Sequence, residues 1–174
     1  MEDNFDISKL KSGKPKRVNS RNKGNAFERK ICKILNERFE TKEFNRSPGS
    51  GAYATTHALP EEYKIHGDII TPRNFKFCIE CKKGYNGIKI SDIFNKKSKL
   101  WEFIEQSEKD SKNSNKESLI IFQQDRQNIL CIINSCFGFG YLKEYTIIHS
   151  LRKNNYLLVK LEDYLKLDDY YFLE

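Results

Sequence analysis

Two short runs of uninterrupted apolar residues constrain the fold of this chain most strongly. Residues 119–122 read Leu-Ile-Ile-Phe and residues 129–133 read Ile-Leu-Cys-Ile-Ile. A strand with one face in water alternates apolar and polar side chains, whereas a strand covered on both faces is apolar throughout. The two runs therefore predict central strands of a sheet with helices on both sides, which is an α/β architecture.

Weaker signals before these runs give the order of the first elements. An amphipathic stripe through residues 25–39 predicts a helix, and the Gly, Pro and Ser residues of 46–54 predict a mobile loop without core residues. Residues 65–71 and 75–82 are rich in Ile and Phe and predict an antiparallel hairpin, with Pro72 in its turn.

The second half of the chain carries further elements. Apolar residues from Ile93 to Ile104 at helical spacing predict a second helix, and we expect the polar stretch 105–117 that follows to end in a loop. Residues 156–159 predict a strand and residues 161–167 a short acidic helix. The expected fold is a small mixed central sheet flanked by helices.

The length of 174 residues fits one domain. We expect a basic arm at residues 1–19, a core at 20–140 and an accessory segment of the same domain at 141–174. No apolar run reaches the ~18 residues that span a bilayer, so we expect no membrane partner and a soluble, intracellular protein. Five scattered cysteines predict free thiols in a reducing compartment: Cys32, Cys78, Cys81, Cys131 and Cys136.

The net charge of +7 predicts a polyanionic partner. The surplus lies between Ile7 and Phe27, which hold seven basic residues and no acidic one. This arm either follows a phosphate backbone or only solubilises the protein. The lysines near 96–99 either form a solvated helix face or follow DNA. The DNA-binding candidates are Lys14, Lys16, Arg17, Arg21, Lys23, Arg46, Ser50, Lys96, Lys97 and Lys99.

Strand geometry brings chemically useful side chains together in the predicted hairpin. Alternate residues of a strand share a face, so Cys78, Glu80 and Lys82 point one way. Asp68, on the preceding strand, can lie beside Glu80. Two carboxylates on half-buried strands are costly unless they are paired or bind a cation, and carboxylate oxygens are ligands that Mg²⁺ prefers. The Glu80–Lys82 pair alone could be structural, but the pair together with Asp68 indicates a metal site.

These motifs resemble the PD-(D/E)XK nuclease superfamily. The signature residues are Gly67-Asp68 and Glu80-Cys81-Lys82, with Glu28 on the first helix. The segments Lys23-Gly-Asn-Ala-Phe-Glu28 and Arg46-Ser-Pro-Gly-Ser-Gly51 are similar to the opening helix and the Ser/Gly loop of archaeal and phage Holliday-junction resolvases. Gly67 replaces the Pro of the signature's name.

The resemblance implies catalytic roles for Glu28, Asp68, Glu80 and Lys82. Asp68, Glu80 and the backbone carbonyl of Cys81 would bind Mg²⁺, or Mn²⁺ in its place, and Glu28 would complete the site directly or through water. Lys82 would hold and polarise the attacking water. Arg46 and Ser50 would contact DNA. The implied products carry a 5′-phosphate and a 3′-hydroxyl.

Three functions stay open at this point. The resemblance favours a metal-dependent endonuclease that resolves four-way DNA junctions, which requires a homodimer because each chain offers one site. A restriction or repair nuclease of the same superfamily is the alternative. A noncatalytic nucleic-acid-binding module is the third possibility. It is disfavoured because it assigns no function to the clustered carboxylates of a basic protein.

Overall fold

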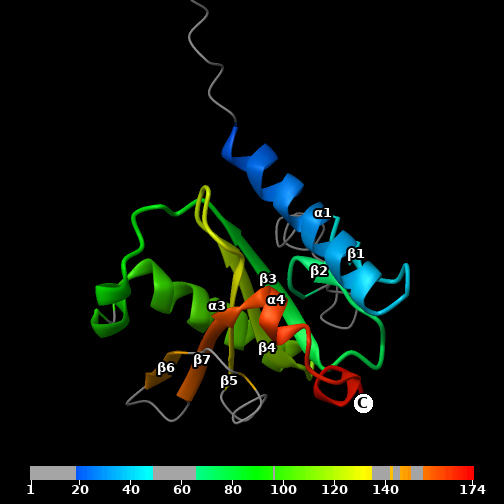
Figure 1. Cartoon of the computed structure of the whole chain (residues 1–174). Helices are drawn as coiled ribbons and strands as arrows, with labels where there is room; N and C mark the ends of the chain where they lie inside the picture. Colours follow the sequence, from blue (N-terminus) through cyan, green and yellow to red (C-terminus); the bar gives the residue numbers. More distant parts are fainter. Residues whose placement is uncertain (1–18, 49–65, 96, 135–141, 143–145, 150–154) are drawn as a thin grey trace, which may run out of the picture.

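The computed structural model describes residues 19–48, 66–95, 97–134, 142, 146–149 and 155–174 (Figure 1). The described helices are α1 (Ser20–Arg38), α3 (Lys99–Asn113) and α4 (Leu161–Tyr164), with 3-10 turns η3 (Ile90–Phe94) and η4 (Asp169–Tyr171). The described strands are β1 (Asn45–Arg46), β2 (Ile69–Ile70), β3 (Phe77–Lys83), β4 (Glu117–Gln123), β5 (Leu130–Asn134), β6 (Thr146–His149) and β7 (Asn155–Lys160).

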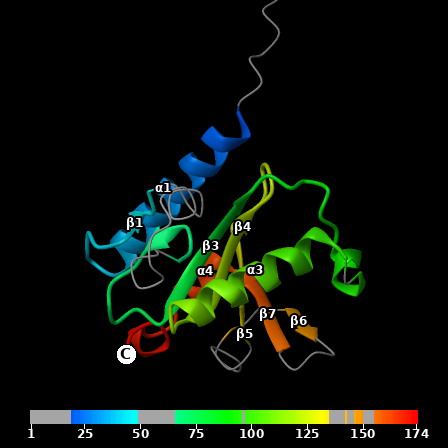
Figure 2. The ribbon, with the colours of Figure 1, turned by 180° about the vertical axis from the view of Figure 1, so that it is seen from behind.

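The strands form one mixed sheet in the order β1-β2-β3-β4-β5-β7-β6. The β3–β4 pair is parallel, and every other described pair is antiparallel. In Figure 1, α4 lies in front of the strands and α3 behind them, and Figure 2 shows α3 in front after a turn of 180°. The predicted α/β fold with a mixed sheet flanked by helices is confirmed.

Two apolar clusters sandwich the sheet. The larger one joins α1, α4 and the C-terminal turn to one face, and includes Ile31, Ile79 and Phe172. The smaller one joins α3 to the other face, and includes Phe103 and Ile120. The central strands β4 and β5 are buried on both faces, as their uninterrupted apolar runs predict.

The first helix begins at Ser20, five residues earlier than its apolar stripe predicts. The side chain of Asn19 caps this end, because its Oδ1 accepts a hydrogen bond from Arg21 N at 3.0 Å. The added turn is largely exposed, so it carries no apolar pattern to reveal it. Arg21 and Lys23 therefore lie on a helix rather than on an extended arm.

The polar stretch 105–117 ends in a turn, as expected, but most of it is helix. Helix α3 continues to Asn113, and β4 begins at Glu117. The helix faces the sheet here with Ser107 and Ser111, which are buried although they are polar. Ser107 Oγ lies 2.7 Å from Ser118 Oγ of β4. Small hydroxyl side chains thus replace apolar ones at the packing positions, and the helical period disappears from the hydropathy pattern.

Lys97 and Lys99 do not share the face of a helix, which is one of the two alternatives for the lysines near 96–99, and Lys96 lies outside the described residues. Lys97 lies before α3 and Lys99 is the first residue of that helix. The prediction for the loop 46–54 needs correction at its start, because Arg46 belongs to β1 and Ser47 is 2% exposed. The rest of that loop lies outside the described residues.

The other secondary structure expected within the described residues is found, with small changes of length. The hairpin is confirmed, with Phe75 N donating to Pro72 O at 3.0 Å in the turn, although β2 has only two residues. Strand β7 and helix α4 confirm the predictions in the tail, where α4 is shorter than expected. The described cysteines are free and buried: Cys32, Cys78, Cys81 and Cys131. Cys136 lies outside the described residues.

Candidate active site

The pairing of β2 with β3 brings the two predicted carboxylates together. Ile69 lies opposite Ile79 in this antiparallel pair, so Asp68 lies beside Glu80. The Asp68 carboxylate accepts a hydrogen bond from Cys81 N at 2.8 Å through Oδ2, and its own backbone N donates to Ile79 O at 2.8 Å. Both carboxylates are buried, with residue exposures of 7% for Asp68 and 3% for Glu80.

Gly67 permits this close approach of the two strands. Its φ of +77° is a left-handed conformation, and a Cβ there would lie 2.7 Å from Ile79 O and 2.9 Å from Cys78 Sγ. Proline holds φ near −65° and could not adopt this conformation. The position that carries Pro in the name of the signature therefore requires Gly in this chain.

Glu80 and Lys82 share the face of β3 that α3 covers, as the period of the strand predicts. The ammonium of Lys82 donates to Glu80 Oε1 and to Gln106 Oε1, the latter at 3.1 Å. Gln106 Nε2 in turn donates to Glu80 Oε1 at 2.9 Å. The Lys82 ammonium also lies 5.2 Å from the centre of the Phe103 ring. Helix α3 thus holds the Glu80–Lys82 pair in one arrangement.

Burial and neighbouring charge shift the proton affinities of this pair. Burial raises the pKa of Glu80 to about 7, the neighbouring Asp68 acts in the same direction, and Lys82 opposes the rise only in part. Burial alone would lower the pKa of Lys82, but Glu80 and Asp68 raise it overall. The two carboxylates therefore form a site with excess negative charge that one ammonium does not neutralise.

Glu28 lies on the other side of β3, on α1, and has a different partner. Its carboxylate forms an ion pair with Arg46 Nε, and Arg46 Nη2 donates to Asn25 Oδ1 at 3.0 Å. Within the described residues, no three His, Cys, Asp or Glu side chains form a cluster that could hold a metal ion. The structure thus brings Asp68 and Glu80 together and leaves Glu28 paired with arginine.

The predicted DNA-binding residues do not gather on one element. Arg21 and Lys23 are exposed on the first turns of α1, and Lys97 is exposed before α3. Lys99 forms an ion pair with Glu102 on the surface of α3. The other candidates, Lys14, Lys16, Arg17, Ser50 and Lys96, lie outside the described residues.

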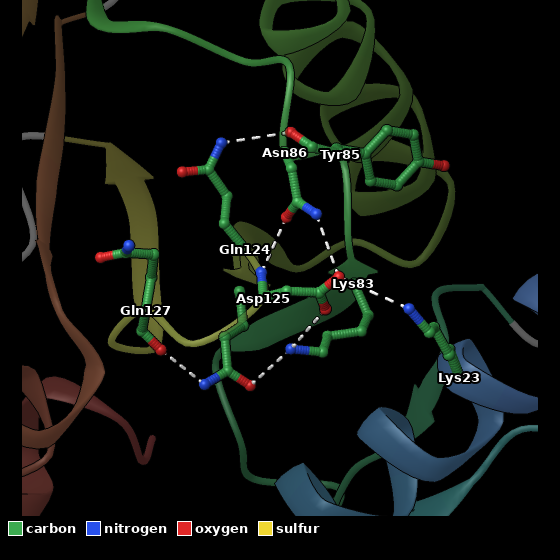
Figure 3. Close-up of polar contacts among 8 residues, drawn as sticks. Lys23, Lys83, Tyr85, Asn86, Gln124, Asp125 and Gln127 are labelled. Carbon is green, nitrogen blue, oxygen red and sulfur yellow. Dashed lines mark hydrogen bonds and ion pairs between the residues drawn. The ribbon is translucent and has the colours of Figure 1, made fainter. Parts of the chain in front are cut away.

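Sequence reasoning missed two groups of residues around the site. Gln106 went unnoticed because it lies in a polar stretch without an apolar pattern to show which side faces the sheet. The second group surrounds Asp125 in the turn between β4 and β5, where Lys23, Lys83 and Asn86 converge (Figure 3). Of this group only Lys23 was a predicted DNA-binding residue, and its link to Lys83 and Asp125 had no sequence signal because Asp125 is remote from both in sequence.

Comparison with known proteins identifies the family. Residues 19–169 match the family described as "Phage putative PDDEXK endonuclease", which is most of the chain. The chain belongs to this family. It is also 32% identical over 123 residues to "Protein D14" of Escherichia phage T5, an alignment that covers 68% of this chain and 72% of that protein. No solved structure matches the chain significantly.

As a PD-(D/E)XK family member, the protein is a nuclease, a hydrolase whose substrate is DNA. The members of this superfamily usually use divalent metal ions. The residues of this chain fit such an ion, because Asp68 and Glu80 offer buried carboxylate oxygens with an excess of negative charge. Within the described residues, no helix is long and apolar enough to cross a membrane.

Proposed function

We propose that the protein is a metal-dependent DNA endonuclease whose active site consists of Asp68, Glu80, Lys82 and the backbone carbonyl of Cys81. The observation that carries this proposal is the buried pair Asp68 and Glu80. Two adjacent buried carboxylates destabilise a fold unless a cation binds them, and hard oxygen ligands select Mg²⁺ or Mn²⁺. A chain without a catalytic use for this pair would gain stability by losing it.

The residues of the chain have separate roles in phosphodiester hydrolysis. A divalent ion, when bound, supplies positive charge that stabilises the phosphoryl group in the transition state. Asp68 is held in position by Cys81 N, and Glu80 by Gln106. Lys82 orients the attacking water and stabilises negative charge as it develops on the phosphate. Products with a 5′-phosphate and a 3′-hydroxyl are expected.

Glu28 has a less direct role in this proposal. Its ion pair with Arg46 holds the guanidinium at the start of the 46–54 segment, where we expect contact with DNA. Direct or water-mediated binding of a metal ion by Glu28 would compete with this ion pair, and Arg46 could then bind a DNA phosphate instead. Because charge-assisted pairs with phosphate are strong, such an exchange is physically reasonable.

The preferred substrate in this proposal is a four-way DNA junction. The segments that resemble Holliday-junction resolvases are the start of α1 and the segment that begins with Arg46, and Glu28 and Arg46 from these segments are in contact. One site per chain then requires a homodimer for the two cuts that resolve a junction. The apolar residues of 129–139 and of the tail beyond Tyr141 are the expected source of the dimer interface. Ile132 and Ile133 are buried within the sheet, so they do not contribute to it.

A cleavage assay tests this function. Labelled four-way junction, duplex of matched sequence and single strands are incubated with the protein in Mg²⁺ or in EDTA. We expect paired cuts in the junction with Mg²⁺ and none with EDTA. Cleavage of duplex at the same rate would favour the restriction or repair nuclease, and binding without any cleavage would favour the noncatalytic module.

Substitutions assign the site. Asp68→Asn, Glu80→Gln and Lys82→Ala should each abolish cleavage and leave junction binding largely intact, because affinity comes mainly from phosphate contacts elsewhere. Asp168→Asn and Lys109→Ala are matched controls at exposed positions and should cleave normally. Wild-type cleavage by Asp68→Asn or Lys82→Ala would contradict the assignment.

A further inference from the structure

The carboxyl end of β3 carries two lysines that point to opposite faces of the sheet. Lys82 lies on the face covered by α3, with Glu80 and Gln106. Lys83, the next residue, lies on the face of α1, where its ammonium is 6.0 Å from the centre of the Phe27 ring. The alternation of a strand thus places one ammonium in the proposed active site and the next one just across the strand.

Lys83 converges with Lys23 of α1 on one carboxylate. Lys23 Nζ lies 3.4 Å from Asp125 Oδ2, and Lys83 Nζ lies 3.5 Å from Asp125 Oδ1 (Figure 3). Both distances exceed the ~2.7 to 2.9 Å typical of a charge-assisted hydrogen bond. Asp125 therefore brings the two ammonium groups together without binding either of them tightly, and the group of three carries a net charge of +1.

A network of hydrogen bonds fixes Asp125 in this place. Asn86 Nδ2 donates to Asp125 Oδ2 at 3.0 Å, and Asp125 N donates to Asn86 Oδ1 at 2.8 Å. Gln124 Nε2 donates to Tyr85 O at 3.1 Å and to Ile88 O at 2.8 Å. These bonds join the loop after β3 to the turn after β4. The cluster of Lys23, Lys83 and Asp125 therefore lies beside two loops that are hydrogen-bonded to each other.

The backbone of both loops adopts an uncommon conformation. Tyr85 has a φ of +53° and Arg126 a φ of +62°, which residues other than glycine rarely adopt. Such conformations persist where the surrounding structure requires them, and they concentrate at binding and catalytic sites. The side chains in question remain accessible, with exposures of 42% for Lys23, 37% for Asp125 and 18% for Lys83.

We propose that Lys23 and Lys83, held together by Asp125, bind one phosphate of the DNA backbone beside the scissile phosphate. This inference rests on the proposed function for the identity of the ligand. A DNA strand that crosses the carboxyl end of β3 at Lys82 also passes Lys83, which lies on the opposite face of β3. The net charge of +1 matches a single phosphodiester. Lys83 Nζ also donates to Gln123 Oε1 at 3.2 Å, but an ammonium has three N–H groups, so each lysine keeps at least one for a phosphate oxygen.

The proposal makes a specific statement about salt dependence. Each DNA phosphate that a protein neutralises contributes about 0.9 to the slope of log affinity against log salt. Because the cluster neutralises one phosphate with a net charge of +1, removal of either lysine abolishes the contribution. Lys23→Gln and Lys83→Gln should each lower the slope by about 0.9, and the double variant should lower it no further.

The test measures binding of the full chain to fluorescently labelled four-way junction and duplex by anisotropy, in EDTA, between about 50 and 200 mM salt. As salt rises over this range, the affinity of each single variant should fall by a factor that is roughly three to four times smaller than the factor for the wild type. Lys166→Gln is the matched control, since Lys166 also pairs with a carboxylate, Asp163, on α4. Urea unfolding checks that Lys83→Gln folds, and the exposed Lys23→Gln tests the same phosphate independently.

The outcomes separate this inference from the proposed function. Unchanged slopes in both single variants would refute the shared phosphate, as would an additive loss in the double variant or an equal loss in Lys166→Gln. Mg²⁺-dependent cleavage by the wild type together with unchanged slopes would support the nuclease function and refute only this phosphate contact. Absence of cleavage together with lowered slopes would support the phosphate contact and refute the proposed nuclease function.

Discussion

Replacement of Glu80 by glutamine should stabilise the protein in the absence of metal. Most substitutions of buried residues destabilise a fold, so a gain in stability is a sharp expectation. Glu80 lies next to Asp68 in a buried site, and glutamine has nearly the same shape without the charge. The amide oxygen that Glu80→Gln introduces can still accept the hydrogen bonds that Gln106 and Lys82 donate to Glu80 Oε1 in the wild type.

The magnitude follows from the shift in proton affinity. The pKa of Glu80 is raised from 4.5 to about 7, mainly by burial and then by Asp68. At ~1.36 kcal/mol for each pKa unit, the ionised carboxylate destabilises the fold by about 3 kcal/mol above pH 7. This figure already includes the opposing effect of Lys82 on the pKa of Glu80. We expect a net gain of about 3 kcal/mol.

The sign of the pH dependence is fixed by the same shift. Between pH 4.5 and about 7 the folded protein binds more protons at Glu80 than the unfolded chain does, so the wild type loses stability as the pH rises through this window. The glutamine variant lacks this loss. Its advantage should therefore be full above pH 7 and should disappear as the pH falls toward 4.5.

The assay is urea unfolding of wild type, Glu80→Gln and Glu117→Gln in EDTA from about pH 5 to 8. Glu117 is the control, because it is an exposed glutamate on the adjacent strand β4 and its replacement should have little effect. Mg²⁺ should then stabilise the wild type more than Glu80→Gln, since a ligand that binds only the folded state adds its binding free energy. A variant less stable than the wild type at the alkaline end of this range, or a difference independent of pH, would refute the reasoning.

Three further predictions test the surroundings of the site. Gln106→Ala should lower the cleavage rate about 10- to 100-fold with unchanged junction affinity, because Gln106 holds both Glu80 and Lys82; an unchanged rate in single-turnover assays would contradict this. Removal of the residues before Ser20 should weaken DNA binding and lower its salt slope without unfolding the protein, and an arm that only solubilises would leave both unchanged. Light scattering should give about twice the monomer mass, and a mixed dimer with one Asp68→Asn subunit should nick junctions without resolving them; a monomer that makes paired cuts would count against the dimer.

The sequence by itself determined the architecture and the clustering of Asp68, Glu80 and Lys82. The uninterrupted apolar runs of β4 and β5 could only be accommodated in a sheet covered on both faces. The period of β3 placed Glu80 and Lys82 on one face, and the hairpin placed Asp68 beside them. These predictions succeeded because they depend on neighbours in sequence or on a single strand pairing, which local patterns encode.

Other features were decided by contacts that no local pattern contains. Helix α3 extends through a polar stretch because Ser107 and Ser111 pack on the sheet, and this extension brings Gln106 to the candidate active site. Glu28 and Arg46 are remote in sequence, and only the docking of α1 beside β1 makes them an ion pair.

The cluster around Asp125 shows the same division most clearly. Lys23, Lys83 and Asp125 come from a helix, a strand and a turn, and 102 positions separate Lys23 from Asp125. The sequence showed that the chain carries a surplus of basic residues, but it could not show which of them share a carboxylate. That choice depends on how the parallel pair β3 and β4 aligns the loops at its carboxyl end, which is a property of the folded sheet and of no segment alone.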